Sequence, residues 1–265
     1  MKFMTFNIRT SSLPDKRNPW DKRKQRVIDL VLQQAPDVVG FQEVQQDQLN
    51  ALVEGLPGYG CHHQGWQANV EKQELLPIFY LKDHVTIARS GAFWLNKTPE
   101  IPRLEDGEVL RACTWLHITF LGENKLRTIA VYNSHFDNKK KWLRDFSANL
   151  VLDRISCQSS GMPTVFFGDL NMTPGSSAYQ LLRARFRDAF LDSPAPRSTN
   201  DITCHGFTGV TTRSWYRPTF QWIDYILMDG PLSCNSAARI LASPGTKPML
   251  YPSDHWPLMA ELVPV

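Results

Sequence analysis

Paired cysteines are missing from this sequence. Its five cysteines, at positions 61, 113, 157, 204 and 234, are odd in number and widely spaced, and no two form a C-x-x-C pair. Such pairs are typical of zinc sites and thiol redox motifs, so the cysteines indicate neither. Isolated cysteines are instead typical of reduced thiols in an intracellular protein.

Long hydrophobic runs are missing as well. No apolar stretch approaches the roughly 18 residues that indicate a membrane-spanning helix. Charged residues occur throughout the first thirty positions, which therefore contain no signal-peptide core. We expect a cytoplasmic protein with no membrane span, and no sequence feature requires an obligate protein partner.

A large excess of charge is also absent. The net charge is +3 at pH 7 and the pI is near 8.6, whereas a protein that holds a long duplex by charge alone is far more basic. A polyanionic partner such as nucleic acid is allowed but not required. Repeats, low-complexity tracts and linkers are missing too, and the 42% of hydrophobic residues are spread along the chain. We therefore expect a single domain over residues 1–265.

A buried strand followed by polar residues is the clearest local pattern. Thr164–Phe167 is β-prone, apolar and bounded by proline and glycine, which is typical of a fully buried strand. Asp169 and Asn171 follow it, and Ser176 and Ser177 then favour the start of a helix. The acid and the amide either form a site at the strand end or shape a turn, which both residue types do well.

Other predicted strands also lead to polar or titratable side chains. The runs at 2–7 and 37–42 and a hairpin over 113–133 lead to Asn7, Glu43 and His135, respectively. The strand predicted at 220–228 contains Asp224 among apolar residues, where an unpaired carboxylate is costly. Asp254 and His255 precede a terminal strand at 256–262. The pattern thus predicts one cluster built from six strands.

The remaining pattern defines the fold class. Helical periodicity occurs over 21–36, 49–56, 138–157 and 177–186, further strands are predicted at 76–81, 85–87 and 91–95, and residues 59–75 have no clear period. Paired strands with helices between them, joined mostly as hairpins, favour an α+β class or a layered α/β sandwich.

These side chains match the requirements of a hard divalent cation. Mg²⁺ prefers one or two carboxylates and keeps positions for water and substrate phosphate, and Glu43 with Asn7 satisfies this preference. The set therefore indicates metal-assisted phosphoester hydrolysis. The plainer alternative is that Asp224 and His255 form a buried pair with a structural role only.

Six short motifs resemble those of the endonuclease/exonuclease/phosphatase superfamily, whose members include nucleases, deadenylases, sphingomyelinases and inositol-polyphosphate phosphatases. The motifs are NIR at 7–9, FQEV at 41–44, NSHFD at 133–137, GDLN at 168–171, IDYI at 223–226 and SDH at 253–255. They occur in the superfamily's order, so the resemblance covers essentially the whole chain.

The resemblance implies a four-layer αββα sandwich, in which two mixed, mainly antiparallel sheets pack face to face with helices outside. It also implies a metal site. Glu43 would be the principal ligand of Mg²⁺, or of Mn²⁺, with Asn7 beside it. Asp254 would support the metal or its waters.

The same resemblance assigns the catalytic roles. Asp169, oriented by Asn171, would position and deprotonate the attacking water. His255 would bond a phosphate oxygen as a cation, with its pKa raised by Asp224. His135 would contact the phosphate or assist the leaving group.

Substrate contacts are less defined. Arg9 and Arg111 are candidate phosphate contacts, although Arg111 fits an ordinary surface arginine equally well. The basic residues at the expected site mouth are either a solvated surface or a steering patch; they are Arg17, Lys22, Arg23 and Lys139 to Lys141. The tryptophans at positions 20, 66, 94 and 142 either stack a base or pack in the core.

The motif forms narrow the substrate only partly. FNIR, FQEV and FWL at 93–95 are most similar to a bacterial subgroup of unknown substrate, and the WN and QETK forms of apurinic-site endonucleases are missing. We expect a nuclease-like phosphodiesterase that prefers small or single-stranded substrates. The alternatives are a phosphatase or phosphodiesterase for a lipid head group, inositol phosphate or nucleotide, and a non-catalytic phosphate-binding module.

Overall fold

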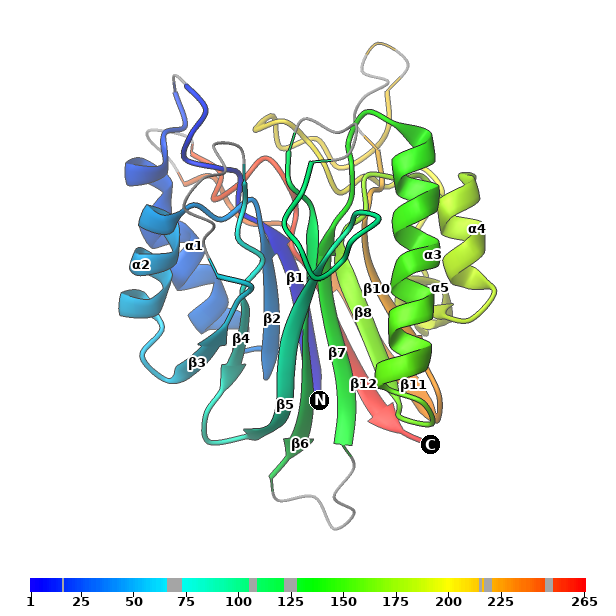
Figure 1. Ribbon diagram of the computed structural model, residues 1–265. Coiled ribbons are helices and arrows are strands. Elements are labelled where there is room, and N and C mark those ends of the chain that lie inside the picture. Colours follow the sequence, from blue (N-terminus) through cyan, green and yellow to red (C-terminus); the bar gives the residue numbers. More distant parts are fainter. Residues whose placement is uncertain are drawn as a thin grey trace.

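Two sheets packed face to face form the centre of the computed structural model, and helices cover their outer faces (Figure 1). The structure describes residues 1–15, 17–65, 73–104, 109–121, 128–214, 216, 221–245 and 250–265. This four-layer arrangement of helix, sheet, sheet and helix confirms the predicted fold class.

The first sheet has six strands in the part of the chain that the structure describes. They are β1 at Lys2–Asn7, β2 at Val38–Gln42, β3 at Tyr59–His62, β4 at Ile78–Leu81, β11 at Leu232–Arg239 and β12 at Leu258–Pro264. Their order across the sheet is β11-β12-β1-β2-β4-β3. The central pair, β1 and β2, is parallel, so the chain crosses over through a helix between them.

The second sheet also has six described strands. They are β5 at Val85–Trp94, β6 at Ala112–Phe120, β7 at Thr128–His135, β8 at Thr164–Asp169, β9 at Arg187–Asp188 and β10 at Asp224–Asp229. Their order is β5-β6-β7-β8-β10-β9, and β7 and β8 are parallel. Each sheet is therefore mixed, with antiparallel pairs around one parallel pair.

Helices lie on the two outer faces (Figure 1). They are α1 at Trp20–Gln34, α2 at Gln46–Gly55, α3 at Lys141–Gln158, α4 at Ser177–Arg183 and α5 at Ala189–Asp192. The Oγ of Ser176 accepts a hydrogen bond from the backbone N of Tyr179 at 3.3 Å, which confirms the predicted cap of α4.

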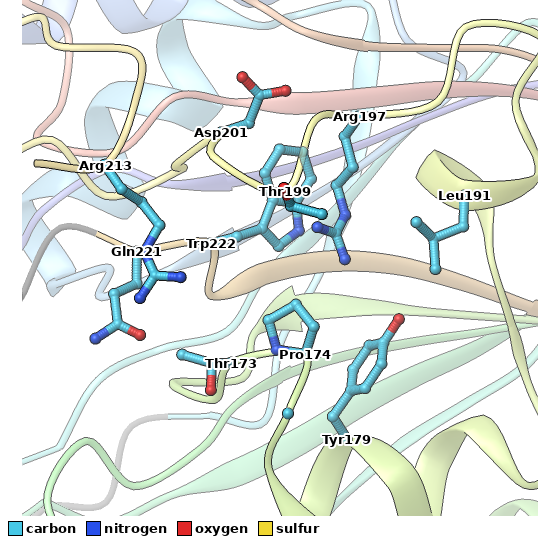
Figure 2. Close-up of a pocket in the computed structure, with 11 residues that line it drawn as sticks. Thr173, Pro174, Tyr179, Leu191, Arg197, Thr199, Asp201, Arg213, Gln221 and Trp222 are labelled. Atoms are coloured by element: carbon cyan, nitrogen blue, oxygen red, sulfur yellow. The ribbon is translucent and has the colours of Figure 1, made fainter.

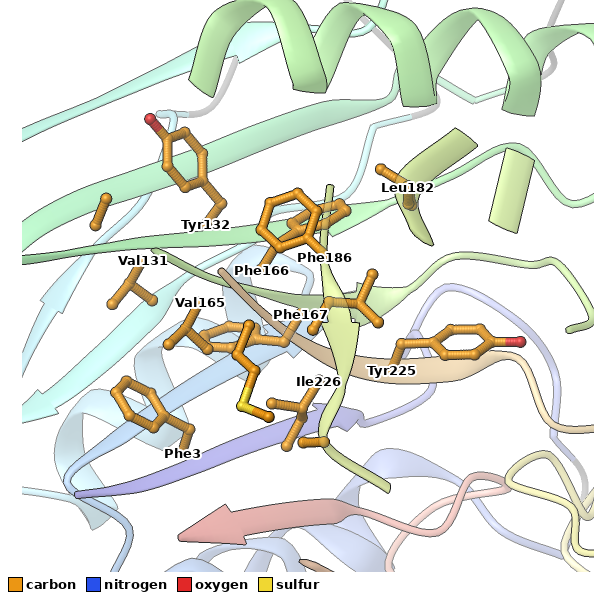
Figure 3. Close-up of a cluster of buried hydrophobic side chains, with 14 of the residues drawn as sticks. Phe3, Val131, Tyr132, Val165, Phe166, Phe167, Leu182, Phe186, Tyr225 and Ile226 are labelled. Carbon is orange, nitrogen blue, oxygen red and sulfur yellow. The ribbon is translucent and has the colours of Figure 1, made fainter. Parts of the chain in front are cut away.

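The core follows from strands that are apolar on both sides. Phe3 belongs to the cluster that includes residues between the sheets, while its neighbour Met4 packs in the cluster with α1 and α2, because successive side chains on a strand point to opposite faces. Figure 3 shows Val165 and Phe167 of β8 on one side of the strand and Phe166 on the other. A Cβ on Gly40 would lie 2.1 Å from the Phe167 ring, so the sheets approach closely here.

Several local predictions were wrong. Residues 59–62, expected to be irregular, form β3, because pairing with β4 satisfies their backbone without an apolar pattern. The strands expected at 85–87 and 91–95 are one strand, β5, with a register shift between Ile87 and Arg89. Strand β11 was not predicted. The expected hairpin connections are only part of the topology, since two central strand pairs are parallel.

Element ends also shifted. Helix α3 begins at Lys141, not at position 138, because the Asp137 Oδ1 atom accepts hydrogen bonds from the backbone N–H groups of Lys139 and Lys140, at 2.8 and 2.6 Å. Strand β12 begins at Leu258, not at 256. The predicted hairpin turn at 122–124 and the first residue of the strand predicted at 220–228 lie outside the described residues.

Candidate active site

The strand register brings the predicted residues to one end of the two sheets. Asn7 at the end of β1 lies beside Gln42 at the end of β2, directly before Glu43. His135 at the end of β7 is in register with Asp169 at the end of β8. Strand β10 runs the other way and begins at Asp224, opposite Asp169.

Asn7 joins two carboxylates. Its Nδ2 atom donates to Glu43 Oε1 and to Asp169 Oδ2, both at 2.9 Å. Its Oδ1 atom accepts from the backbone N of Arg9 at 2.9 Å, so the amide nitrogen faces the carboxylates. The backbone N of Thr10 donates to Glu43 Oε2 at 3.0 Å. Hydrogen bonds thus fix both carboxylates across the gap between the sheets.

His255 lies between Asp169 and a further carboxylate, Asp224. Its Nδ1 atom is 2.9 Å from Asp224 Oδ2, and its Nε2 atom is 3.8 Å from Asp169 Oδ2. Burial opposes a charge on the ring, but the nearby Asp224 carboxylate outweighs it and raises the pKa of His255 well above its ordinary value. His255 is therefore a cation at neutral pH.

Asp169 and Asp254 are harder to ionise than usual. Burial and the neighbouring Asp224 raise the pKa of Asp169. Burial also raises the pKa of Asp254, and Glu43 adds to the effect. Four carboxylates that share so little solvent repel one another, so the site favours a bound cation.

Asp254 and His255 are attached to the first strand. Ser253 Oγ donates to the backbone O of Asn7 at 2.6 Å and accepts from the backbone N of His255 at 3.2 Å. Asp254 Oδ2 is 3.9 Å from Arg9 Nη1. Arg9 itself is held by Asp15, through contacts of 2.9 and 3.0 Å, and this pairing raises the pKa of Arg9 against the opposing effect of burial.

His135 is oriented by residues from three segments. Asn171 Nδ2 donates to His135 Nε2 at 2.9 Å and to the Phe136 O at 3.1 Å, so the side chain of Asn171 orients His135, while its backbone N binds Asp169 Oδ1 at 3.0 Å. On the other side of the ring, Nδ1 lies 2.9 Å from Glu74 Oε2.

Glu74 was missed by the sequence analysis. Its Oε2 atom also accepts from Arg111 Nη1 at 2.7 Å, and Arg111 lies 2.8 Å from His135 Nδ1. Burial would raise the pKa of Glu74, but Arg111 and His135 lower it to about 2. Arg111 is therefore not an ordinary surface arginine, and its contact with phosphate stays a prediction. Glu74 lies near the end of the aperiodic stretch at 59–75, where no pattern identified it.

Backbone strain concentrates at the same place. Arg9, Glu43 and Asn171 have φ angles of 60°, 62° and 47°. These lie in the left-handed region that residues other than glycine rarely adopt. Gly168, just before Asp169, has a φ of 148°, and a Cβ there would lie 1.9 Å from the backbone O of Ser134. Such strain clusters at functional sites, where surrounding contacts maintain it.

Buried hydrogen bonds made by Gln42 and Asn133 connect the two sheets next to the site. Gln42 Nε2 donates to Asn133 Oδ1 at 2.7 Å, and Asn133 Nδ2 donates to the backbone O of Phe41 at 2.9 Å. All these groups are buried. A hydrogen-bonded bridge in a buried position fixes the relative placement of the two sheets, and with it the strand ends.

Two groups of described side chains have the geometry for a metal ion. Glu43, His135 and Asp169 form one group, and Asp169, Asp224 and His255 form the other. The donor atoms within each group lie within 4.8 Å of one another. Each group has two carboxylates and one histidine, but the histidine of the second group is the cationic His255, so the first group fits a hard divalent cation better. Asp254 belongs to neither group.

One predicted basic residue has a different position from the one expected. Arg23 is fully buried, and its guanidinium donates to backbone carbonyls of Asn18, Ile8, Pro252 and Arg9, at 2.7 to 3.1 Å. It cannot steer a substrate at the site mouth. Its position on the buried side of α1 was not visible from the cluster of neighbouring basic residues.

The tryptophans divide between core and surface. Trp20 and Trp94 are buried, as expected for packing residues, and Trp142 is 46% exposed. Trp66 lies outside the described residues. Neither buried tryptophan is available to stack a base.

The fold and the strand-end cluster are those of a phosphoester hydrolase family. Residues 4–255 match the model of the Endonuclease/Exonuclease/phosphatase family, and the chain belongs to this family. Members of the family are phosphoester hydrolases. The resemblance seen in the sequence motifs is thus confirmed.

Solved structures share the fold over the full chain. An endonuclease/exonuclease/phosphatase family protein from Bacteroides thetaiotaomicron is 24% identical, with a TM-score of 0.89, over 100% of this chain and 98% of that one. A mannosyl-6-phosphatase from the same organism is 23% identical, with a TM-score of 0.86 and 99% of both chains covered. TDP2 of D. rerio, solved with a single-strand DNA product, is 16% identical, with a TM-score of 0.76, over 99% and 98%.

Curated relatives are longer than the matched region. Two uncharacterised proteins of Acanthamoeba polyphaga mimivirus are 25% and 24% identical over 62% and 57% of this chain, which spans only 28% and 59% of their lengths. In the described part of the chain, none of the helices is both long and apolar enough to cross a membrane.

Proposed function

We propose that this chain is a divalent-metal-dependent phosphodiesterase for small or single-stranded substrates. The main support is a single arrangement: Asn7 joins Glu43 and Asp169 by 2.9 Å hydrogen bonds, while the cationic His255 faces Asp169 at 3.8 Å. A cation and an imidazolium on either side of a buried acid suit a reaction that builds negative charge on phosphate oxygens.

Glu43 is the oxygen donor proposed to hold Mg²⁺, with Mn²⁺ as the alternative, and Asp169 lies in the same group of close donors. Asn7 is their partner, and it becomes a ligand itself only if its amide turns so that Oδ1 replaces Nδ2. Asp254 is assigned to the waters around the ion, because it lies outside the two groups of close donors. When bound, the cation supplies charge that stabilises the phosphate oxygens in the transition state.

Asp169 is the proposed general base. Its raised pKa, caused by burial and by Asp224, brings the carboxylate closer to the proton affinity that general bases need near neutrality. The backbone N of Asn171 binds Oδ1 and leaves Oδ2 facing the centre of the site. From this position Oδ2 would accept the proton of an attacking water.

His255 is the proposed phosphate contact. Asp224 occupies Nδ1, so Nε2 is the nitrogen left to donate to a non-bridging phosphate oxygen. His135 is proposed to contact the phosphate or the leaving group, with its ring fixed by Glu74 and Asn171. Arg9 is proposed to contribute positive electrostatic potential at the entrance of the site, while Asp15 fixes the position of the Arg9 guanidinium. Arg111 acts through His135.

A purely binding module would not need this arrangement. Asp169 and Asp224 are 2% exposed and stand opposite each other in register. Burying two acids together costs desolvation and repulsion, and a module that only binds an anion gains nothing from them. The non-catalytic alternative is therefore disfavoured.

A small phosphomonoester is the second candidate substrate. The observation that favours it is the full-length structural likeness to a protein named as a mannosyl-6-phosphatase. The likeness to TDP2, solved with single-strand DNA, favours the diester. Lipid head groups, inositol phosphates and nucleotides remain chemically equivalent alternatives, because the same strand-end residues serve all of them.

A substrate panel tests the proposal directly. Purified protein with Mg²⁺, with Mn²⁺ or with excess EDTA is given plasmid, a single-stranded oligonucleotide, RNA, bis-p-nitrophenyl phosphate, p-nitrophenyl phosphate, mannose 6-phosphate and sphingomyelin. We expect metal-dependent cleavage of the small diester and the oligonucleotide in preference to plasmid. Turnover of the monoesters alone would favour the second candidate, and tight plasmid binding with a steep salt dependence would contradict the substrate preference.

A single domain over residues 1–265 and a cytoplasmic location stay predictions. All five cysteines, which lie among the described residues, are free thiols. Free thiols suit a reducing compartment, and fractionation of the native host's cells would test the location.

A further inference from the structure

A cavity of about 500 Å³ lies beside the site (Figure 2). Thr173 is in its wall two positions after Asn171, and Trp222 is in its wall two positions before Asp224. Asp169 and Asp224 are opposite each other on β8 and β10, so the cavity is built on the loops that leave this strand pair. A volume of this size is typical of a small-molecule site.

Two buried donors in the cavity wall have no hydrogen-bond partner. They are Arg197 Nε and Trp222 Nε1, on side chains that are 6% and 3% exposed. A buried donor without an acceptor carries the desolvation cost of an unmade hydrogen bond, and folded proteins leave few such donors. Figure 2 shows the guanidinium of Arg197 pointing into the space between Thr173, Pro174 and Tyr179. Both atoms have almost no accessible surface, so an acceptor in the cavity removes these penalties once the Arg197 and Trp222 side chains rotate slightly toward it.

The structure explains why Arg197 keeps its position. Its guanidinium carbon lies 4.7 Å from the centre of the Trp222 ring, and Nη2 is 3.7 Å from Asp188 Oδ2. Asp188 also accepts from Tyr179 Oη at 2.9 Å. These contacts use the ring face and the far end of the guanidinium, and they leave Nε without a partner.

The charge in the cavity is positive. The exposed Arg213 lies on the opposite wall, and Figure 2 shows its guanidinium directed toward the cavity rather than away from it. The only carboxylate among the described lining residues, Asp201, is bound by Arg239 at 3.2 Å and by the backbone N of Ser198 at 2.9 Å. The Arg213 guanidinium therefore faces a space whose one acid is already paired, and the Arg197 guanidinium beside it is paired with Asp188.

The rest of the wall suits an organic group. Pro174, Leu191 and the ring of Tyr179 form an apolar side next to the donors. A ligand that fits must therefore combine an apolar or ring-shaped body with an anionic end.

We propose that this cavity binds a second anionic group of the substrate, a carboxylate or a phosphate on the part of the molecule remote from the reacting phosphoester. The proposal rests on the proposed phosphoester hydrolase function and specifies its substrate class. The anion accepts from Arg197 Nε and Trp222 Nε1 and is paired by Arg213, while its organic body packs on the apolar side.

Matched aryl esters test the proposal. The kcat/KM of phenyl p-nitrophenyl phosphate is compared with that of its 4-carboxyphenyl and 4-phosphonophenyl analogues, and the three corresponding aryl monoesters are run in parallel. We expect the anionic esters to be preferred by about tenfold or more, as charged hydrogen bonds predict. A preference for one anion over the other identifies its source as carboxylate or phosphate. Equal kcat/KM values for charged and uncharged esters would overturn the proposal.

Two variants link the preference to the cavity. Arg213→Gln removes an exposed charge, and Trp222→Phe removes the Nε1 donor but keeps a ring under Arg197. Each should bring the ratio of charged to uncharged kcat/KM close to one. Arg89→Gln, an exposed arginine on β5, is the matched control and should keep the wild-type ratio. Unfolding temperatures show whether each variant is folded, and an unchanged ratio in folded Arg213→Gln and Trp222→Phe would contradict the assignment.

A binding measurement separates this inference from the proposed function. Calorimetry compares phenylphosphonate with 4-carboxyphenylphosphonate, neither of which can be hydrolysed. If no ester is turned over, the hydrolase proposal fails. Tighter binding of the carboxylated probe, lost in Arg213→Gln, would still support the cavity as an anion site, and equal binding of the two probes would reject it.

Discussion

The Nδ1 atom of His255 lies 2.9 Å from Oδ2 of Asp224, and the two residues are only 6% and 2% exposed. Burial alone would favour a neutral ring, but the Asp224 carboxylate raises the pKa of His255 well above its ordinary value. An imidazolium is thus held within 3.8 Å of Asp169. The charge of the ring, and not only its position, depends on Asp224.

Replacing Asp224 with Asn should move the pH profile. Without the carboxylate, the pKa of His255 falls, so the protonated ring is lost at lower pH and the alkaline limb of kcat/KM shifts to lower pH. The raised pKa also adds stability that is present below the unfolded value of about 6.5 and is lost as pH rises through the folded value. A pH series of initial rates measures the limb, and an unchanged limb would remove Asp224 from this role.

A second Asp–His pair provides the control. Asp37 Oδ1 lies 2.7 Å from His84 Nδ1, and the His84 side chain is 58% exposed. Solvent screens this pair. Asp37→Asn should therefore leave the alkaline limb where it is in the wild-type protein.

Replacing Glu43 with Gln should weaken the binding of the divalent cation on which activity depends. Glu43 contributes one of the two carboxylates that Asn7 joins, and a neutral amide is a poorer ligand for a hard cation. Activity should fall by about 10²-fold or more, because a bound cation supplies several kcal/mol to the transition state. Titration with Mg²⁺ measures the change. Glu54→Gln on the exposed face of α2 is the control, and full wild-type activity in excess EDTA would refute the premise.

Glu74→Gln should reduce stability in a pH-dependent way. The pKa of Glu74 is lowered from 4.5 to about 2, which corresponds to about 3 kcal/mol. A lowered acid pKa adds stability above pH 4.5 that is lost as pH falls toward 2. In urea unfolding, the free energy of unfolding should therefore be higher for wild type than for the variant at pH 7, and this difference should narrow below pH 4.5.

The exposed ion pair of Glu100 with Arg154 is the control for this prediction. Removing it with Glu100→Gln should change stability little, since solvent screens exposed pairs. A double-mutant cycle with Arg111→Met then measures the coupling between Glu74 and Arg111. If the difference in unfolding free energy between wild type and Glu74→Gln stayed constant from pH 7 to pH 3, Arg111 and His135 would not be lowering the pKa of Glu74.

Much of the site was predictable because it follows strands that are buried on both faces. An apolar run such as Thr164–Phe167 has one plausible structure, and a polar residue at its end must lie at the rim of the sheet. The same logic located Asn7, Glu43 and His135. The motif order then fixed which ends meet, and the parallel register of β7 with β8 brought His135 beside Asp169.

The rest depended on contacts between distant segments. Glu74 has no pattern around it, and only the folded chain places it against Arg111 and His135. The left-handed backbone of Glu43 is imposed by the site and opposes its local preference. Strand β11, with the sequence LSCNSAAR, has few apolar residues and is a strand because β12 pairs with it.

Arg23 gives the last prediction, because its role was the least visible in the sequence. It donates to carbonyls of Ile8 and Arg9 after β1 and of Pro252 before the SDH motif, and so joins two segments of the site. Burial lowers its pKa to about 10, which still leaves it charged at pH 7.

Arg23→Met should leave buried carbonyls without donors and cost about 3 kcal/mol or more. Arg23→Lys should recover only part, because an ammonium cannot reproduce the planar fork. Lys24→Met, on the exposed side of α1, is the control for urea unfolding. Equal stability of Arg23→Met and Lys24→Met would show that the buried guanidinium does not hold these segments together.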